Sequence, residues 1–179
     1  MPYLSVIQFW FEEITPAQWW QKSDEFDALI RDRFSILHQS ATHCELFEWR
    51  CCPRGQLAEI IILDQFSRNL FRDQAAAFAH DNLALALAQQ AIADGSDQSV
   101  GSKHRGFFYM PFMHSESKKI QTQSVQLFTQ PGLSSHLSSA QRHRDIIERF
   151  GRFPHRNKIL GRPSTTEEQA FLKQPGSSF

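Results

Sequence analysis

The sequence predicts an all-α protein in which about eight helices pack as an array or bundle within one domain, residues 1–179. Apolar residues recur at three- and four-residue spacing along most of the chain, and no stretch of strand length alternates apolar and polar residues. Since 41% of the 179 residues are hydrophobic, the chain can bury a sizeable core. No sequence repeat with a period of about 20–50 residues is visible.

The predicted helices have recognisable starts. We expect helices over residues 16–20, 23–38, 55–69, 73–94, 103–110, 117–128, 133–150 and 165–172. Thr15 is expected to cap the first of them, because Pro16 follows at the first helical position. Ser164 and Glu167 have the spacing of a capping box before the last helix. The aromatic segment 3–13 fits either a strand or a helix.

The ends of several helices are also marked. Gly95 and Gly151 each follow the last periodic residue of a helix, where glycine often adopts the left-handed conformation that ends it. Pro111 has no backbone N–H and is expected to break its helix. We also expect the alanine-rich segment 73–94 to break near His80. The turns that remain are short, as in a helical array.

Charge balance and hydropathy argue against two classes of partner. The chain has 19 Lys and Arg against 19 Asp and Glu, whereas a nucleic-acid-binding module needs a basic excess to bind phosphates. No apolar run approaches the roughly 20 residues that cross a bilayer, and the N-terminus lacks a signal-peptide pattern. We therefore expect a cytoplasmic protein that binds neither nucleic acid nor membrane. The oligomeric state is left open.

The three cysteines, an odd number, do not form a disulfide framework. His43, Cys44, Cys51 and Cys52 include zinc-ligand types, but their spacing matches no common zinc site. Reduced thiols fit a cytoplasmic protein, and the role of these cysteines is left open. We predict no metal and no cofactor, since the sequence has no Walker loop and no GxGxxG, GxSxG or HExxH motif.

The segment 57–72, LAEIIILDQFSRNLFR, places an acid and a base on an apolar helix. On a regular helix Asp64 and Arg68 lie within about 20° of Leu57, so both continue an apolar stripe. Removing such a pair from water costs several kcal/mol per ion before their attraction offsets the loss. We interpret the pair as lining a polar pocket. The alternative is a plain intrahelical salt bridge at the helix end.

A second polar segment, YMPFMHSE, covers residues 109–116. His114 and Glu116 follow the break expected at Pro111, and loops that interrupt helices are common places for polar side chains to converge. We include both in the candidate site, although a cap or a surface residue explains His114 equally well.

The third polar segment, HRDIIERFGRFPHRN, covers residues 143–157. His143 shares a helix face with apolar residues, where a core histidine bonded to a carbonyl is the common outcome. Asp145 is expected to pair with Arg149 on another face. A patch of donors follows and could bind phosphate or carboxylate; the alternative is a solvated turn. The patch consists of Arg152, His155, Arg156 and Asn157.

These strings, together with DNLALALAQQAI and SVQLF, resemble a bacterial family known as domain of unknown function 924. The resemblance extends from Phe9 to the C-terminal PGSSF and departs at Cys51-Cys52-Pro53, where relatives are more polar. It implies a tetratricopeptide-like array of antiparallel helix pairs, with no established activity. The family's motifs fall on Asp64, Gln65, Arg68, Asn69, Arg72, His114, Glu116, His143, Arg144, Asp145, Arg152, His155, Arg156 and Asn157.

Two functions compete on this basis. The first is a polar pocket for a small anionic molecule, with acid–base catalysis by a histidine or carboxylate whose pKa burial has shifted. Its predicted residues should meet in one concavity of a few hundred Å³. They are Asp64, Arg68, Asn69, Arg72, His114, Glu116, His143, Asp145, His155, Arg156 and Asn157. The second is a tetratricopeptide-like groove that binds a peptide or a protein. The sequence slightly favours the first.

Overall fold

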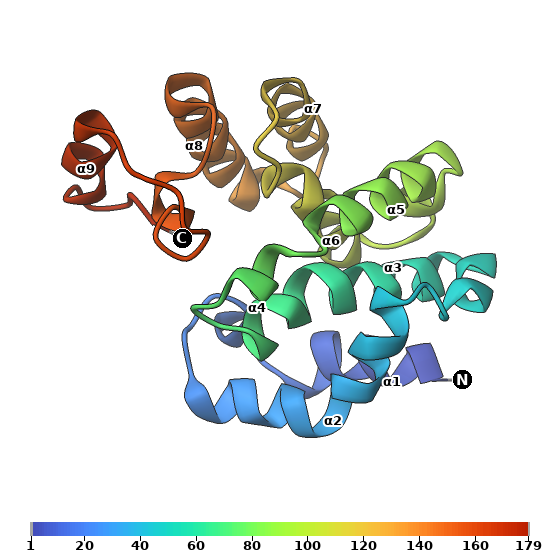
Figure 1. The fold of residues 1–179 in the computed structure, drawn as a ribbon. Helices are drawn as coiled ribbons and strands as arrows, with labels where there is room; N and C mark the ends of the chain where they lie inside the picture. The colour runs from blue at the N-terminus through green and yellow to red at the C-terminus, as the bar shows by residue number, and fades with distance from the viewer. Residues whose placement is uncertain (1, 179) are drawn as a thin grey trace.

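The computed structural model describes residues 2–178, and within that range it contains helices and no strands (Figure 1). The α-helices are α1 (Pro2–Gln8), α2 (Asp24–Thr42), α3 (Pro53–Ile61), α4 (Ser67–Leu70), α5 (Asp81–Ala93), α6 (Ser102–Met113), α7 (Lys118–Phe128), α8 (Ser134–Phe150) and α9 (Thr166–Leu172). The shorter helices are the π-helices η1 (Phe9–Glu13) and η4 (Ile62–Phe66) and the 3₁₀-helices η2 (Pro16–Trp19), η3 (Phe47–Cys51), η5 (Ala75–Phe78), η6 (Ser96–Ser99) and η7 (Pro154–Arg156). The all-α prediction is confirmed.

Several predicted helix boundaries are confirmed by local geometry. The Ser23 hydroxyl accepts the Phe26 N–H at 3.2 Å and caps α2. Gly95 and Gly151 have φ of 74° and 70°, so each ends its helix in the left-handed conformation. The alanine-rich segment breaks as expected, because α5 begins directly after His80.

The expected break at Pro111 is wrong, because α6 continues through Pro111 to Met113. Proline removes one N–H from a helix, and at this position the loss falls within the last turn. The helix still closes, since the His114 N–H bonds the Met110 carbonyl at 3.0 Å. The Gln121 side chain also donates to the Met113 carbonyl at 2.7 Å, which satisfies one of the acceptors left at the helix end.

The capping box of the last helix lies one residue later than predicted. Glu168 accepts the Thr165 N–H at 2.7 Å, and the Thr165 hydroxyl accepts the Glu168 N–H at 3.2 Å. Arg152 fixes this register, because its guanidinium holds both Glu168 oxygens at 2.6 and 2.8 Å. Glu167, the capping residue expected from the sequence, instead accepts from Arg149 Nε at 2.8 Å.

The N-terminal aromatic segment is helical, which decides between the strand and helix readings. It continues from α1 into η1, where Phe9, Trp10 and Phe11 are all buried. The Phe9 ring lies 4.9 Å from Phe34 on α2, and the Trp10 ring lies 5.4 Å from Phe66. Aromatic contacts of this kind anchor the first segment against the centre of the fold.

One continuous helical run, α3–η4–α4, passes through the middle of the molecule. Ile60, Ile61, Ile62 and Leu63 are fully buried, as expected for a helix that is apolar on nearly every side. The π turn η4 adds a residue to one turn of this run, so the regular-helix azimuths expected for residues 64 and 68 do not hold. Such turns are often found at functional sites.

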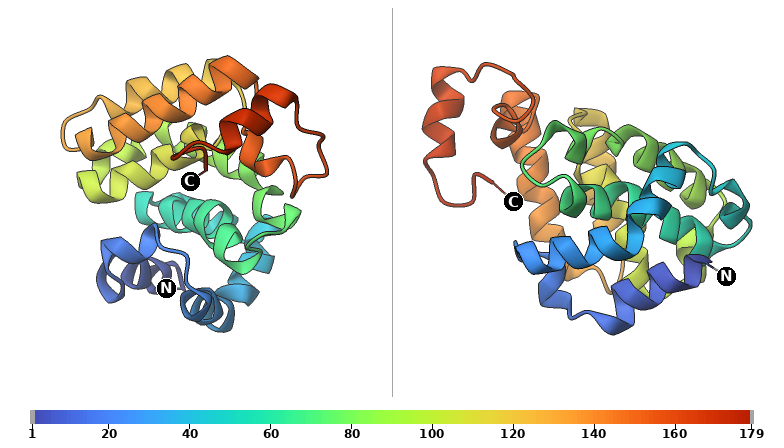
Figure 2. Two further views of the ribbon diagram at one scale, coloured as in Figure 1. Left: turned by 90° about the vertical axis from the view of Figure 1, so that its left-hand side faces the viewer. Right: turned by 60° about the horizontal axis from the view of Figure 1, so that its bottom comes forward.

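The helices are arranged in sequence order across the molecule (Figures 1 and 2). α1 and α2 pack against α3 and α4, α3 contacts α5, and α7 packs between α6 and α8. α9 and the segment around η7 lie at the outer end, beside α8. This order is compatible with a tetratricopeptide-like array.

The apolar core falls into two clusters. The larger one contains residues between Val6 and Ala140, and a small one contains Ile146, Ile147 and Phe153. The C-terminal segment therefore packs on its own apolar group rather than on the main core. Among residues 2–178, no helix combines the length and apolar character needed to cross a membrane.

Two glycines on α3 and α6 should respond oppositely to an added methyl group. A Cβ at Gly55 would lie 2.0 Å from the Trp49 carbonyl oxygen, whereas a Cβ at Gly106 would meet only Leu133 at 3.5 Å. We expect Gly55→Ala to lower the free energy of unfolding by about 1–3 kcal/mol through overpacking. Gly106→Ala should raise it by about 0.5–1 kcal/mol through helix propensity. Urea unfolding measures both; equal effects would contradict this packing.

Candidate functional site

The centre of the candidate site is the Asp64 carboxylate, which η4 places inside the protein with 1% of its side chain exposed. Its Oδ1 accepts from His114 Nδ1 at 2.7 Å and lies 3.4 Å from Arg68 Nη1. Its Oδ2 accepts from the Gln65 amide at 2.5 Å. Burial alone would raise the pKa of Asp64, but His114 and Arg68 outweigh it and hold the pKa well below its usual range.

His114 directly follows the last residue of α6 and contacts Asp64 through one ring nitrogen. Burial, together with the Arg68 charge, lowers the pKa of His114, so the ring is neutral at pH 7. An ionised carboxylate only accepts hydrogen bonds, so the proton of the neutral ring sits on Nδ1. Nε2 therefore carries a lone pair, and 13% of the side chain remains exposed.

Arg68 on α4 connects Asp64 to a second carboxylate that the sequence analysis missed. Its Nη1 donates to the Asp64 backbone carbonyl at 2.6 Å. Both Nη atoms also donate to Asp81, at 3.0 and 3.1 Å. Asp81 is the first residue of α5, where a carboxylate also faces the positive end of the helix dipole. The sequence feature that could have identified Asp81 is its position directly after the helix break predicted near His80.

Arg156 on η7 brings a second guanidinium to Asp81, whose Oδ2 lies 3.2 Å from Arg156 Nη1. The guanidinium carbon lies 4.5 Å from the centre of the Phe78 ring and 4.6 Å from that of Phe153. The residue is 5% exposed, and its buried Nε has no hydrogen-bond partner among residues 2–178. Burial, followed by the Arg68 charge, lowers the pKa of Arg156 to about 10.

Two further histidines lie beside this cluster. The His143 ring lies 6.5 Å from the His114 ring, and its Nδ1 bonds the Ser139 carbonyl at 2.8 Å, as expected for a core histidine. Burial lowers the pKa of His143 to about 3 and that of His155 to about 4. Both rings contact Phe153, at 5.6 and 5.8 Å. The pKa values of all three histidines are thus lowered by burial.

Asn69 and Arg72, which the sequence placed in the site, belong to a separate network. Both bind Asp27 on α2, Asn69 at 2.8 Å and Arg72 through Nη2 at 2.6 Å. A bond from Arg72 Nε to the other Asp27 oxygen completes this ion pair. These contacts join α4 and the turn after it to α2.

Glu116 borders the cluster and is matched by a residue that the sequence analysis did not select. Its carboxylate accepts both Arg162 Nη groups, at 2.7 and 2.9 Å, and the Phe153 N–H at 2.8 Å. Asn157 accepts from Arg162 Nε at 3.0 Å, which joins it to the same group. These bonds attach the C-terminal segment to the loop after α6.

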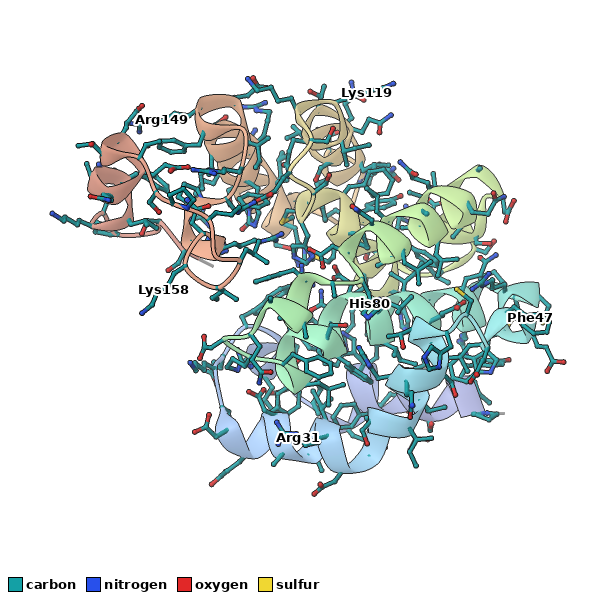
Figure 3. The ribbon with its side chains drawn as sticks, in the orientation of Figure 1. Arg31, Phe47, His80, Lys119, Arg149 and Lys158 are labelled. Carbon is teal, nitrogen blue, oxygen red and sulfur yellow. The ribbon has the colours of Figure 1, made fainter. Side chains whose placement is uncertain are left out.

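Asp145 lies on the surface, with 65% of its side chain exposed, and pairs with its neighbour Arg144. The expected pair with Arg149 is wrong, because Arg149 binds Glu167 on α9 at 2.8 Å. Figure 3 shows Arg149 and Lys158 on the outside of the C-terminal elements, whereas His80 lies near the middle of the molecule. The donors of the predicted patch have separate partners, since Arg152 binds Glu168 on α9 whereas Arg156 binds Asp81 on α5.

Two cavities in the described part of the chain are lined by residues outside the cluster. One, of about 100 Å³, is lined by Arg50, Glu59 and the end of α5, and the other, of about 290 Å³, by Tyr3, Cys52 and their neighbours. The concavity predicted around Asp64 is neither of these. Cys44, Cys51 and Cys52 are free thiols. Within residues 2–178, no group of three or more His, Cys, Asp and Glu side chains is arranged to hold a metal.

Comparison with known proteins places the chain among uncharacterised relatives. Residues 6–176 match a family described as bacterial protein of unknown function (DUF924). A solved structure of a protein of unknown function from Agrobacterium tumefaciens is 41% identical, with a TM-score of 0.91 over 96% of each chain. No curated protein matches. The comparisons therefore name a family and a fold but no activity.

The buried histidines make stability depend on pH. Burial lowers the pKa of His38 from its ordinary value of 6.5 to about 4, and it lowers the pKa of His155 to about the same value. Between pH 6.5 and 4 the unfolded chain therefore binds protons that the folded protein does not. We therefore expect the free energy of unfolding to fall as the pH is lowered from 6.5 to 4, by up to about 1.4 kcal/mol per pH unit for each histidine.

Urea unfolding at pH 7.5, 6.0 and 5.0 measures this slope. His38→Gln should reduce the dependence of the unfolding free energy on pH by the contribution of one buried histidine. His43→Gln is the control, because His43 is 60% exposed. Equal stability at all three pH values would contradict the burial of neutral rings.

Proposed function

We propose that this chain, which belongs to the DUF924 family of bacterial proteins of unknown function, binds a small anionic molecule beside Asp64. In this proposal Arg156 binds the anionic group and His114 exchanges a proton with the ligand. The cluster joins residues far apart in sequence, since Asp64, His114 and Arg156 come from η4, the end of α6 and η7. We place the protein in the cytoplasm because its three cysteines are free thiols.

The unmatched guanidinium of Arg156 is the observation that carries the proposal. Its neighbours are matched, since Asp81 binds both Nη groups of Arg68 and Glu116 binds both Nη groups of Arg162. Arg156 has one such bond, at 3.2 Å, and a buried Nε without a partner. A buried charged donor without an acceptor costs about 1–3 kcal/mol or more, which a bound anion would recover.

The Asp64–His114 pair supports proton exchange. Asp64 fixes the ring orientation and the position of its proton on Nδ1, which leaves Nε2 as the base. If Nε2 takes a proton from a ligand hydroxyl or a water molecule, the imidazolium that forms faces the ionised Asp64. General base catalysis of this kind contributes roughly 10²–10⁴-fold to a rate.

The way in which the C-terminal segment is attached supports a route by which the ligand could reach the cluster. η7 carries Arg156, and Phe153 beside it packs in the small apolar cluster rather than in the main core. Its links to the helices before α8 include the Arg156–Asp81 bond and the contacts of Glu116. Outward movement of η7 would therefore open the cluster without exposing the main core. The peptide-binding alternative stays a prediction. None of the contacts described above favours it.

A thermal-shift screen with small carboxylates, phosphate and sulfate tests the proposal. A ligand at 100 times its Kd should add about 2.7 kcal/mol to the free energy of unfolding. Arg156→Gln should lose this gain because it removes the charged fork. Arg149→Gln is the matched control, since Arg149 also lies over two phenylalanine rings but is 49% exposed and pairs with Glu167.

The proposal fails if no anion stabilises the wild type beyond sodium chloride at equal ionic strength. It fails equally if Arg156→Gln responds as the wild type does. Circular dichroism confirms that each variant is folded before the comparison.

A further inference from the structure

We infer that Gln121 on α7 is a positioning residue, which holds His114 against Asp64 by donating hydrogen bonds to the backbone on both sides of His114. This inference rests on the proposed function, because His114 is the group that exchanges a proton there. It adds α7 to the candidate site, since none of the residues placed in the site above comes from that helix.

The backbone at His114 needs partners from outside α6. α6 ends at Met113 and α7 begins at Lys118, so His114 is the first residue of the short connection between the two helices. Its own N–H bonds the Met110 carbonyl at 3.0 Å, but the last carbonyls of a helix have no partner within the helix. The direction in which the chain leaves α6 therefore depends on what binds those carbonyls.

The Gln121 side chain binds them from the neighbouring helix. Its Nε2 lies 2.7 Å from the carbonyl oxygen of Met113 and 2.7 Å from that of Ser115. A side-chain amide has two N–H groups, so one is available for each of these short bonds. Met113 directly precedes His114 in the chain, and Ser115 directly follows it. One planar amide group thus fixes the backbone on both sides of the histidine.

The surroundings of Gln121 agree with a role as a donor. The residue is fully buried, and its Oε1 has no hydrogen-bond partner among residues 2–178. Turning the amide around would place Oε1 against the two carbonyl oxygens, which also only accept, so the contacts settle which end faces them. An unpartnered buried acceptor is unfavourable. What the buried amide contributes is therefore the two bonds that it donates.

The contact between His114 and Asp64 is sensitive to small movements of this backbone. His114 Nδ1 lies 2.7 Å from Asp64 Oδ1, and a separation of about 3.6 Å is no longer a hydrogen bond. Functional groups are usually held within about 0.5 Å by the residues that support them. A backbone shift of about 1 Å would therefore free the ring from Asp64. Asp64 sets the position of the ring proton, and Gln121 sets the position of the ring.

Gln121→Met tests the inference, because methionine fills a similar volume but donates no hydrogen bond. The carbon-bound ring protons of His114 are followed by NMR from pH 8 to pH 5 in the ligand-free full chain, so the result does not depend on anion binding. In the wild type, burial lowers the pKa of His114. In Gln121→Met the pKa should rise toward the ordinary value for histidine, because the ring loses its buried position.

Two controls separate positioning from a general loss of stability. Ser124→Ala changes another fully buried residue of α7, whose Oγ has no partner in the described part of the chain. Gly55→Ala is expected to destabilise the protein at α3 instead. Both variants should titrate at His114 as the wild type does. If Gln121→Met does not fold, Gln121→Asn, which is too short by one methylene to reach both carbonyls, should raise the pKa of His114 in its place.

An unchanged His114 titration in the folded Gln121 variant would overturn the inference and leave the proposed function standing. The inference is also wrong if Ser124→Ala or Gly55→Ala shifts the titration equally, since loss of stability alone would then move the ring. A wild-type His114 that titrates at or above the ordinary histidine pKa would contradict the neutral base in the proposed function, and this inference with it.

Discussion

Keeping the buried Asp64 carboxylate ionised is the constraint on which the candidate site depends. A carboxylate with 1% exposure is stable inside a protein only if charged or polar donors replace the lost water. Gln65, Arg68 and His114 supply those donors from two directions, along the central helical run and from the end of α6. The wider π turn η4 distinguishes the geometry here from that of a regular helix.

The same requirement continues outward through shared partners. Arg68 satisfies Asp64 and then needs Asp81, whose second oxygen also contacts Arg156. At each step a charge is matched by the next group, until the chain of contacts ends at Arg156 Nε, which has no partner in the described structure. An imbalance at the end of an otherwise satisfied network is where a ligand gains most.

Periodicity and capping chemistry predicted most of the fold, because they act within a few residues of sequence. They located the start of α2 at Ser23 and the ends of α5 and α8 at Gly95 and Gly151. They failed at Pro111, where a loss confined to the last helical turn is tolerated. They could not show η4, since residues 60–63 are apolar at every position and show no period there.

The candidate site was only partly predictable. Residue type and burial pattern selected Asp64, Arg68, His114 and Arg156, which the structure brings together, but the same criteria also selected Asn69, Arg72 and Asp145, which have other partners. The partners decide between these cases, and they come from distant segments: Asp27 for one group, Asp81 and Phe78 for the other. The most direct test is ¹⁵N NMR of the His114 ring at pH 7. Our account predicts a neutral ring with its proton on Nδ1; a neutral ring protonated on Nε2, or an imidazolium, would contradict it.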